Sequence, residues 1–260
     1  MKQRVITAVL LLVVVIGALF FDPTGWAVKF LIILVAGIAG VELGNMTKSP
    51  FPNIVPGLLV GYMVLVWGSL PEPILPLIYA YLSMPLLLVS ALKKWSYASL
   101  VFGTVWISST SLTLYQLCSH KDPSFWPILM TAAIPIWCGD TAAIFVGKAF
   151  GKHKMAPTIS PKKTWEGAIG NFLACMAAAL VLGSIFKYPL LPMALLGANC
   201  GILGQAGDLF ESWIKRNADM KDSGTILPGH GGVLDRIDSL IATAPLSLLI
   251  MMLLVVPGKP

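Results

Sequence analysis

The stretch WEGAIGNFLACMAAALVLGSIFK, residues 165–187, has no charged residue between Glu166 near its start and Lys187 at its end. A helix that crosses a bilayer needs about 20 consecutive apolar residues, and this run meets that requirement. Eight further runs of similar character lie near residues 5–21, 27–46, 54–70, 73–92, 96–117, 125–147, 189–209 and 234–256. The sequence therefore predicts an all-α, polytopic integral membrane protein with about nine transmembrane helices.

The composition agrees with a membrane protein. Of the 260 residues, 57% are hydrophobic and only 12% are charged, whereas soluble domains carry roughly a quarter charged residues. Four cysteines are too few for a disulfide-rich secreted scaffold, and the apolar content excludes a disordered chain. The chain has no evident internal repeat and no Ser/Gly-rich linker, so we expect a single membrane-embedded domain over residues 1–260.

The net charge of +6 would suggest a nucleic-acid partner in a soluble protein, but its distribution has another meaning here. With nine helices, 14 of the 18 Lys and Arg residues fall on the side of the amino terminus. Basic residues concentrate in cytoplasmic loops. We therefore expect the amino terminus and the long basic loops in the cytoplasm, and we expect no nucleic acid to bind.

Polar residues gather in the second half of the chain. Residues 1–130 contain apolar helices without a recognised motif, whereas residues 137–239 include the polar positions and two predicted cytoplasmic loops, 148–164 and 211–234. Asp140 interrupts the sixth run, where a charge costs about 2.5 to 3.5 kcal/mol. A water-filled cavity would explain it, and pairing with a lysine or a helix end is the alternative. Asp208 ends the eighth run, where an exposed helix end could also tolerate it.

The segment SWIKRNADMKDSGTILPGHGGVLDRID, residues 212–238, concentrates charge, glycine and proline between two apolar helices. Asp235 and Asp238 are three residues apart at the start of the last helix, so both project from one face. With Asp208 they could form an oxygen-rich site of the kind that Mg²⁺ prefers, although acidic residues at a helix start also favour the macrodipole. His230 lies between glycines and is equally compatible with a loop residue and a catalyst. Four cations can donate to phosphate oxygens: Lys215, Arg216, Lys221 and Arg236. Together these groups indicate phosphoryl or nucleotidyl transfer.

The other loop ends in the tract SPKKTWEG, residues 160–167. We expect Ser160 to cap the seventh helix, with Pro161 in its first position and Glu166 in an early turn. Helix starts attract phosphates through free N–H groups, and Lys162 and Lys163 add positive charge there. The alternative is a basic cytoplasmic anchor in front of a capped helix.

These polar positions resemble the signature of phosphatidate cytidylyltransferases, the CDP-diacylglycerol synthases. The matching positions of the segment 212–238 are Ser212, Lys215, Arg216, Lys221, Asp222, Gly224, Pro228, His230, Gly231, Gly232, Asp235, Arg236 and Asp238. Upstream, Asp140, Gly147, Gly151, Lys152 and the tract 160–167 are also similar to that family. The sequence departs from the family pattern at Ala142 and Ile144, which we expect to affect the shape of a pocket and not its chemistry.

The resemblance implies transfer of a cytidylyl group from CTP to phosphatidic acid, which gives CDP-diacylglycerol and pyrophosphate. It implies Mg²⁺ as the cofactor, alone or with a second cation, and Asp208, Asp235 and Asp238 as metal ligands. Further implied catalytic residues are Lys215, Arg216, Lys221, Asp222, His230 and Arg236. Implied substrate-binding residues are Asp140, Ser160, Lys162, Lys163, Thr164, Glu166, Ser212, Gly231 and Gly232. A homodimer among membrane lipid, in the cytoplasmic (inner) membrane of a bacterium, is also expected.

Two alternatives are compatible with the same residues. An ion- or proton-coupled transporter would also carry intramembrane acids such as Asp140, and it would have inverted repeats with polar residues near the midplane of both halves. The first half offers only Glu42, near the cytoplasmic end of its run, which favours an enzyme at the membrane surface. The second alternative is a related membrane nucleotidyltransferase that acts on another lipid phosphate, because the spacing identifies no residue that reads the base.

Overall fold

The computed structural model describes residues 13, 17, 26–47, 54–67, 83, 86, 96–117, 125–227 and 231–251. The described part is mainly helical. The predicted runs at 5–21 and 73–92 fall almost entirely outside the described residues, and so does His230.

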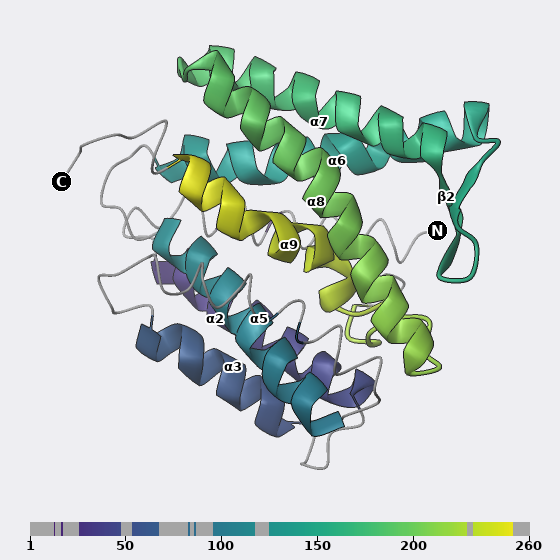
Figure 1. The fold of residues 1–260 in the computed structure, drawn as a ribbon. Helices are drawn as coiled ribbons and strands as arrows, with labels where there is room; N and C mark the ends of the chain where they lie inside the picture. The colour runs from purple at the N-terminus through teal and green to yellow at the C-terminus, as the bar shows by residue number, and fades with distance from the viewer. Residues whose placement is uncertain are drawn as a thin grey trace. The chain divides into compact units, whose positions relative to one another are not determined.

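Seven helices make up most of the described chain (Figure 1). They are α2 (Trp26–Met46), α3 (Ile54–Trp67), α5 (Ser96–Leu117), α6 (Phe125–Phe150), α7 (Trp165–Phe186), α8 (Leu190–Asn217) and α9 (Leu234–Ile250). Each begins within one residue of the start of a predicted apolar run. Hydropathy alone therefore locates the helix starts in the part of the chain that the structure describes.

Four of the described helices are long and apolar enough to cross a membrane: α2, residues Leu129–Phe150 of α6, α7 and α8. The described parts of α3 and α9 have 14 and 17 residues, fewer than the about 20 that a span needs. Helix α5 has the length but carries a hydroxyl-rich stretch around Ser108. The structure thus supports a helical protein with several candidate spans, and the predicted number of nine is not confirmed.

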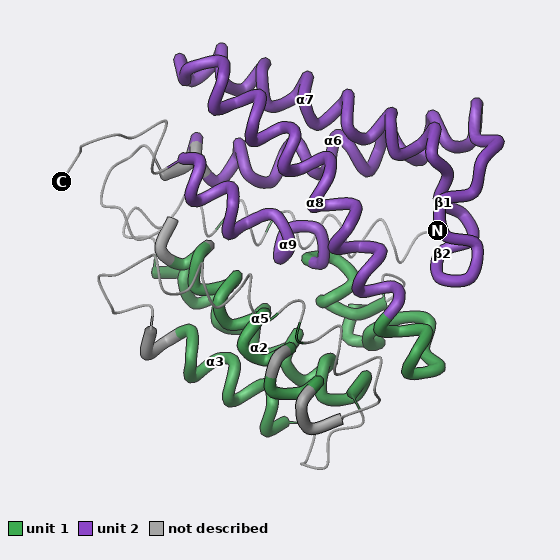
Figure 2. Tube along the Cα trace, in the orientation of Figure 1, with its two compact units in different colours: residues 1–122, 214–237 green, residues 123–213, 238–260 purple. Residues whose placement is uncertain are grey.

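The chain divides into two compact units, which Figure 2 shows in different colours. Unit 1 comprises residues 1–122 and 214–237, and unit 2 comprises residues 123–213 and 238–260. Within unit 1, helices α2, α3 and α5 pack against one another. A Cβ atom on Gly57 of α3 would lie 2.5 Å from the Gly37 carbonyl oxygen of α2. Glycine at this position lets the two backbones approach closely, as small residues do between membrane helices.

Within unit 2, helices α6 and α7 run side by side (Figure 1). Helix α8 meets α7 and α9 through glycines. A Cβ atom on Gly201 would lie 2.8 Å from the Phe172 Cα atom, and one on Gly207 would lie 2.9 Å from the Asp238 carbonyl oxygen. Because Asp208 directly follows Gly207, this close packing fixes where the Asp208 carboxylate leaves α8.

The first predicted cytoplasmic loop is largely a two-stranded antiparallel hairpin. Strand β1 (Lys154–Ala156) pairs with β2 (Ser160–Thr164). The Ile159 N–H donates to the Ala156 carbonyl at 3.2 Å across a turn that begins with Pro157. Proline is favoured there because its ring pre-sets the backbone for the turn. The fold is therefore predominantly α-helical, and the prediction of an all-α fold missed this hairpin.

Thr164 caps α7, and Ser160 does not. Thr164 has an extended backbone, with φ −128° and ψ 153°, and its hydroxyl accepts the Gly167 N–H at 3.1 Å. Ser160 and Pro161 lie in β2, so the predicted cap and the predicted first helical residue are wrong. Serine and threonine are both good cap residues, and the strand pairing selects the later one. Glu166 does lie in the first turn, as predicted.

The second predicted cytoplasmic loop is shorter than expected, because α8 continues to Asn217. Residues 211–217 form its last turns, although the apolar run ends near residue 209. Lys215 and Arg216 are good helix formers, and cations are favourable at a helix C-terminus. Helix α9 begins at Leu234, with Asp235 in its first turn as predicted.

Candidate active site

Two carboxylates and a lysine from separate segments meet within unit 2. The Nζ atom of Lys163 lies 2.7 Å from Oδ2 of Asp208, and the two side chains are 22% and 36% exposed. Asp140 of α6 lies within electrostatic range of both. The Ser212 hydroxyl donates to Oδ1 of Asp208 at 3.3 Å. We call these four residues the Asp140 cluster, and all four were predicted from the sequence as site residues.

Two amide side chains support Asp140, and the sequence analysis did not identify them. The Nδ2 atom of Asn171, a 2% exposed residue of α7, donates to Oδ1 of Asp140 at 3.2 Å. The Nε2 atom of Gln205 donates to Oδ1 of Asn171 at 3.3 Å and to the Ala168 carbonyl at 3.0 Å. Each is a polar residue inside an apolar run, which is the same signal that identified Asp140.

The start of α7 carries a second group of predicted substrate-binding residues. The His153 N–H donates to Glu166 at 3.3 Å, and the His153 Nδ1 atom lies 2.7 Å from Glu166 Oε1. Glu166 therefore ties the hairpin to the helix. Thr164 is buried and occupied by its cap, whereas Lys162 is exposed and Ser160 is half-buried. The lysines of this tract are the groups best placed to donate to a phosphate.

Asp235 is the centre of a hydrogen-bonded network in unit 1. The Nζ atom of Lys215 contacts its Oδ1, and the two side chains are only 10% and 9% exposed. Its Oδ2 accepts the Gly232 N–H at 2.8 Å and the Ser223 N–H at 3.0 Å. Asp235 lies outside the four candidate spans. Burial raises the pKa of its carboxyl, but the Lys215 ammonium and the Gly232 N–H together outweigh burial, so that pKa lies below its ordinary value.

The other predicted residues of the segment 212–238 differ in burial and in backbone conformation. Gly231 has a φ of +86°, which glycine adopts without strain, and its carbonyl accepts the Leu227 N–H at 3.0 Å. The exposed side chains are Arg216, Lys221, Asp222 and Arg236, and Asp238 is buried. The segment 212–238 therefore carries three exposed cations, and the predicted role of His230 falls outside the described residues.

A buried glutamate from α2 also joins this segment, although it belongs to no recognised motif. Glu42 is 1% exposed. Its Oε1 accepts the Val233 N–H at 2.9 Å, and its Oε2 accepts the Leu234 N–H at 2.8 Å and the Ser223 hydroxyl at 2.9 Å. Helix starts leave such N–H groups without intrahelical partners. Glu42 thus does for α9 what a capping residue of the same helix usually does.

The predicted magnesium ligands do not form a ready-made cluster in the described residues. In that part of the chain, no three Asp, Glu, His or Cys side chains lie where they could hold a metal ion. Asp235 belongs to unit 1, whereas Asp208 and Asp238 belong to unit 2. Asp235 is paired with Lys215, and Asp208 is paired with Lys163. The donor chemistry nevertheless fits, because carboxylate oxygens are the hard ligands that Mg²⁺ prefers.

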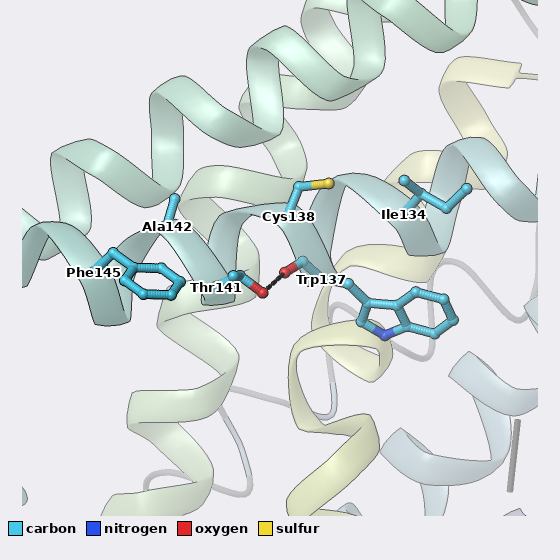
Figure 3. Close-up of a pocket in the computed structure, with 6 residues that line it drawn as sticks. All are labelled: Ile134, Trp137, Cys138, Thr141, Ala142 and Phe145. Carbon is cyan, nitrogen blue, oxygen red and sulfur yellow. Dashed lines mark hydrogen bonds between the residues drawn. The ribbon is translucent and has the colours of Figure 1, made fainter. Parts of the chain in front are cut away.

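An apolar groove of about 430 Å³ lies on the surface of α6 (Figure 3). Its lining residues are Ile134, Trp137, Cys138, Thr141, Ala142 and Phe145. The Thr141 hydroxyl donates to the Trp137 carbonyl at 2.8 Å, so its polar group is used within the helix. Ala142, one of the two departures from the family pattern, does line the groove. Because all six residues belong to one helix, the groove is a surface feature and does not enclose a substrate.

The comparison with known protein families covers almost the whole chain. The cytidylyltransferase family matches residues 2–254. This chain belongs to the cytidylyltransferase family. The match covers residues 2–130, a region in which the sequence analysis recognised no motif, and it includes Glu42.

Family members named phosphatidate cytidylyltransferase align closely with this chain. The protein of Bacillus subtilis (strain 168) is 35% identical over 94% of this chain and 95% of its own length. The protein of Haemophilus influenzae is 30% identical over 94% of this chain and 96% of its own length. The protein of Brucella suis biovar 1 is 41% identical over 61% of this chain and 58% of its own length. The resemblance inferred from the polar positions is therefore confirmed.

Proposed function

We propose that this protein transfers a cytidylyl group from CTP to phosphatidic acid and thereby makes CDP-diacylglycerol for phospholipid biosynthesis. The observation that carries the proposal is the alignment of 94% of this chain with the phosphatidate cytidylyltransferase of Bacillus subtilis. The family match also favours an enzyme over an ion- or proton-coupled transporter.

In the proposed reaction, a phosphate oxygen of phosphatidic acid attacks the α-phosphorus of CTP. The bond between that phosphorus and the oxygen that bridges to the β-phosphate breaks, and pyrophosphate leaves. A phosphate monoester carries about 1.5 to 2 negative charges near pH 7, so the nucleophile needs no strong general base. The protein has to bring two anions together and stabilise their charge.

We assign the binding of the two substrate phosphates to cations at the start of α7 and in the segment 212–238. Lys163, together with the exposed Lys162, would bind the phosphate of one substrate at the start of α7. The exposed cations Arg216, Lys221 and Arg236 would bind the other. Lys215 is buried against Asp235, and its role in the proposal is to hold that carboxylate in place.

Magnesium is the proposed cofactor. Asp208, Asp235 and Asp238 would hold it, with Asp222 as a supporting carboxylate. When bound, the ion would neutralise negative charge on the substrate phosphates. The support for this part of the proposal is the donor chemistry of the residues.

We place the protein in the cytoplasmic membrane of a bacterium, with the amino terminus and the active-site segments in the cytoplasm. The support comes from the four candidate spans, from the asymmetric distribution of basic residues and from the bacterial origin of the relatives. Phosphatidic acid would come from the surrounding membrane lipid and CTP from the aqueous side. A homodimer is proposed from the family resemblance.

The test is the conversion of labelled CTP and phosphatidic acid by detergent-purified protein. We expect CDP-diacylglycerol and one equivalent of pyrophosphate with Mg²⁺, no product after chelation by EDTA, and recovery when Mg²⁺ is added back. Parallel reactions with ATP, GTP and UTP test the choice of nucleotide. No product with any nucleotide, from protein shown to be folded, would refute the proposal. Product from another lipid phosphate alone would point to a related nucleotidyltransferase.

A matched pair of variants tests the phosphate-binding assignment. Lys221→Met and Lys154→Met each remove one exposed lysine, but only Lys221 belongs to the segment that carries Asp235. A hydrogen bond to a charged group contributes about 1.5 to 3 kcal/mol, so Lys221→Met should lower kcat/KM by about 10-fold to 100-fold. Lys154→Met should keep the wild-type value. Equal values for the two variants would remove Lys221 from the phosphate site.

A further inference from the structure

Glu42 of α2 forms hydrogen bonds with Ser223, with Val233 and with the first residue of α9, Leu234. A charged residue in an apolar helix is unfavourable unless it is paired or hydrogen-bonded. The carboxylate offsets that cost by accepting three hydrogen bonds of 2.8 to 2.9 Å from Ser223, Val233 and Leu234. Each of these donors lies within two residues of Asp235 in the chain or is hydrogen-bonded to it.

The three donors surround Asp235. Val233 and Leu234 precede it directly. The Ser223 N–H donates to Oδ2 of Asp235 at 3.0 Å, and the Ser223 hydroxyl accepts the Asp235 N–H at 3.3 Å. The position of the Asp235 backbone is therefore set from two directions by groups that Glu42 binds.

Two glycines of the family signature leave room for this carboxylate. A Cβ atom on Gly232 would overlap the Ser223 hydroxyl and would lie 2.6 Å from Oε2 of Glu42. A Cβ atom on Gly224 would overlap Oε1 of Glu42 and would lie 2.9 Å from its Cδ. The segment is thus built closely around the Glu42 side chain. This gives Gly232, which was predicted to bind substrate, a structural reason to be glycine.

We propose that Glu42 is a positioning residue that fixes Ser223 and the start of α9 and so places Asp235 for the reaction. The inference rests on the proposed function, because it concerns how Asp235 is presented to the substrates. Glu42 itself is 1% exposed, and the three residues that donate to it are also buried. Its effect on turnover must pass through Ser223 and the start of α9.

Glu42→Gln is the most informative substitution, because it keeps the shape of the side chain and removes one acceptor. In the wild type, Oε1 faces the Val233 N–H and Oε2 faces the Leu234 N–H. Whichever way the amide turns, its NH₂ group meets one of these donors, so one N–H loses its partner. Displacing a reacting group by about 1 Å can cost about 100-fold in rate.

The experiment measures steady-state kinetics and amide hydrogen exchange of the full-length protein in detergent. For Glu42→Gln we expect kcat per folded molecule to fall between about 10-fold and about 100-fold, and KM for CTP to change much less. We also expect faster exchange in peptides that contain Val233 and Leu234, and unchanged exchange in α7. Thr47→Val is the matched control directly after α2, because in the described residues the buried Thr47 hydroxyl donates to the Leu43 and Gly44 carbonyls of α2. It should leave both readouts unchanged.

Two further variants keep the inference testable if Glu42→Gln does not fold. Glu42→Asp retains the charge on a shorter side chain, and Ser223→Ala removes one of the three donors. Both should lower kcat in the same direction, and Ser223→Ala should lower it less in the Glu42→Asp background than in the wild type, because the two residues share one network. Normal kcat in both single variants would overturn the inference.

The readouts separate the possible failures. An active wild type with normal kcat in Glu42→Gln would overturn the positioning role and leave the proposed function intact. Faster exchange and a lower melting temperature with normal kcat per folded molecule would show that Glu42 contributes to stability and not to turnover. This result would also overturn the inference. A folded but inactive wild type would refute the proposed function and with it the positioning role, while the exchange data would still decide whether Glu42 anchors the segment.

Discussion

The buried pair of Lys215 and Asp235 makes a quantitative prediction about stability. Asp235→Asn preserves the shape of the side chain but removes its charge. The Lys215 ammonium, whose side chain is 10% exposed, would then have lost the counter-charge that the structure shows. If the new amide keeps its oxygen on the Gly232 N–H, its NH₂ group faces the ammonium, and two donors oppose each other.

The expected size follows from the burial of both partners. Removing one member of a buried ion pair costs about 3 to 5 kcal/mol, because the other charge stays buried and loses its paired counter-charge. At about 2 to 4 °C for each kcal/mol in a chain of this size, Asp235→Asn should lower Tm by about 6 to 20 °C. The double variant Asp235→Asn with Lys215→Met removes both charges, so it should recover most of that loss.

Thermal unfolding in detergent, followed by intrinsic tryptophan fluorescence, measures Tm for the wild type, both single variants and the double variant. Lys215→Met alone should also be destabilised, because it leaves the Asp235 carboxylate buried. A double variant no more stable than Asp235→Asn would refute the assignment of a buried, coupled pair. Activity is expected to be lost in all three variants, so only the stability data decide this point.

Two further predictions concern the start of α7. Thr164→Ala should lower the free energy of unfolding by about 0.5 to 2 kcal/mol because it removes the helix cap, whereas Ser160→Ala should be nearly neutral. Thermal unfolding of the two variants measures both effects. A larger loss of stability in Ser160→Ala than in Thr164→Ala would show that Ser160 is the cap. Lys163→Met removes the ion pair with Asp208 and should lower kcat/KM for one substrate by at least about 10-fold. Lys154→Met, in the same hairpin, should leave kcat/KM unchanged. Separate titrations of CTP and phosphatidic acid show which substrate is affected.

Hydropathy was sufficient to locate the described helices, because the membrane requires apolar side chains and internally bonded backbones over a fixed length. Helix α5 was predicted at 96–117, as observed. The carboxyl end of α8 was missed because hydropathy marks where lipid contact ends, and a helix can continue into water with residues such as Lys215 and Arg216. The hairpin was missed because two strands of three and five residues leave too little periodicity to detect.

The candidate site was predictable where a short polar motif carries it. Asp140, Lys163 and Asp208 were each predicted from their own segments, and the structure brings them together. Glu42 and Ser223 were not identified, because their hydrogen bond joins positions 181 residues apart. A motif records neighbours along the chain, whereas this contact is defined only by packing. The same holds for the predicted metal ligands. Residue type identifies a side chain that can bind a metal ion, but only the fold determines whether three such side chains lie close together.

The long separation between Glu42 and its donors also has a consequence for biosynthesis. Glu42 is synthesised 181 residues before Ser223 and 192 residues before Leu234. At about 5 to 20 residues per second, the ribosome takes roughly 10 to 40 seconds to produce those donors. During that interval the nascent chain carries an acidic group in an apolar helix without its final hydrogen-bond partners, which is costly in lipid. Glu42, the residue that we assign to the placement of Asp235, therefore acquires its three hydrogen bonds only after Leu234 has been translated.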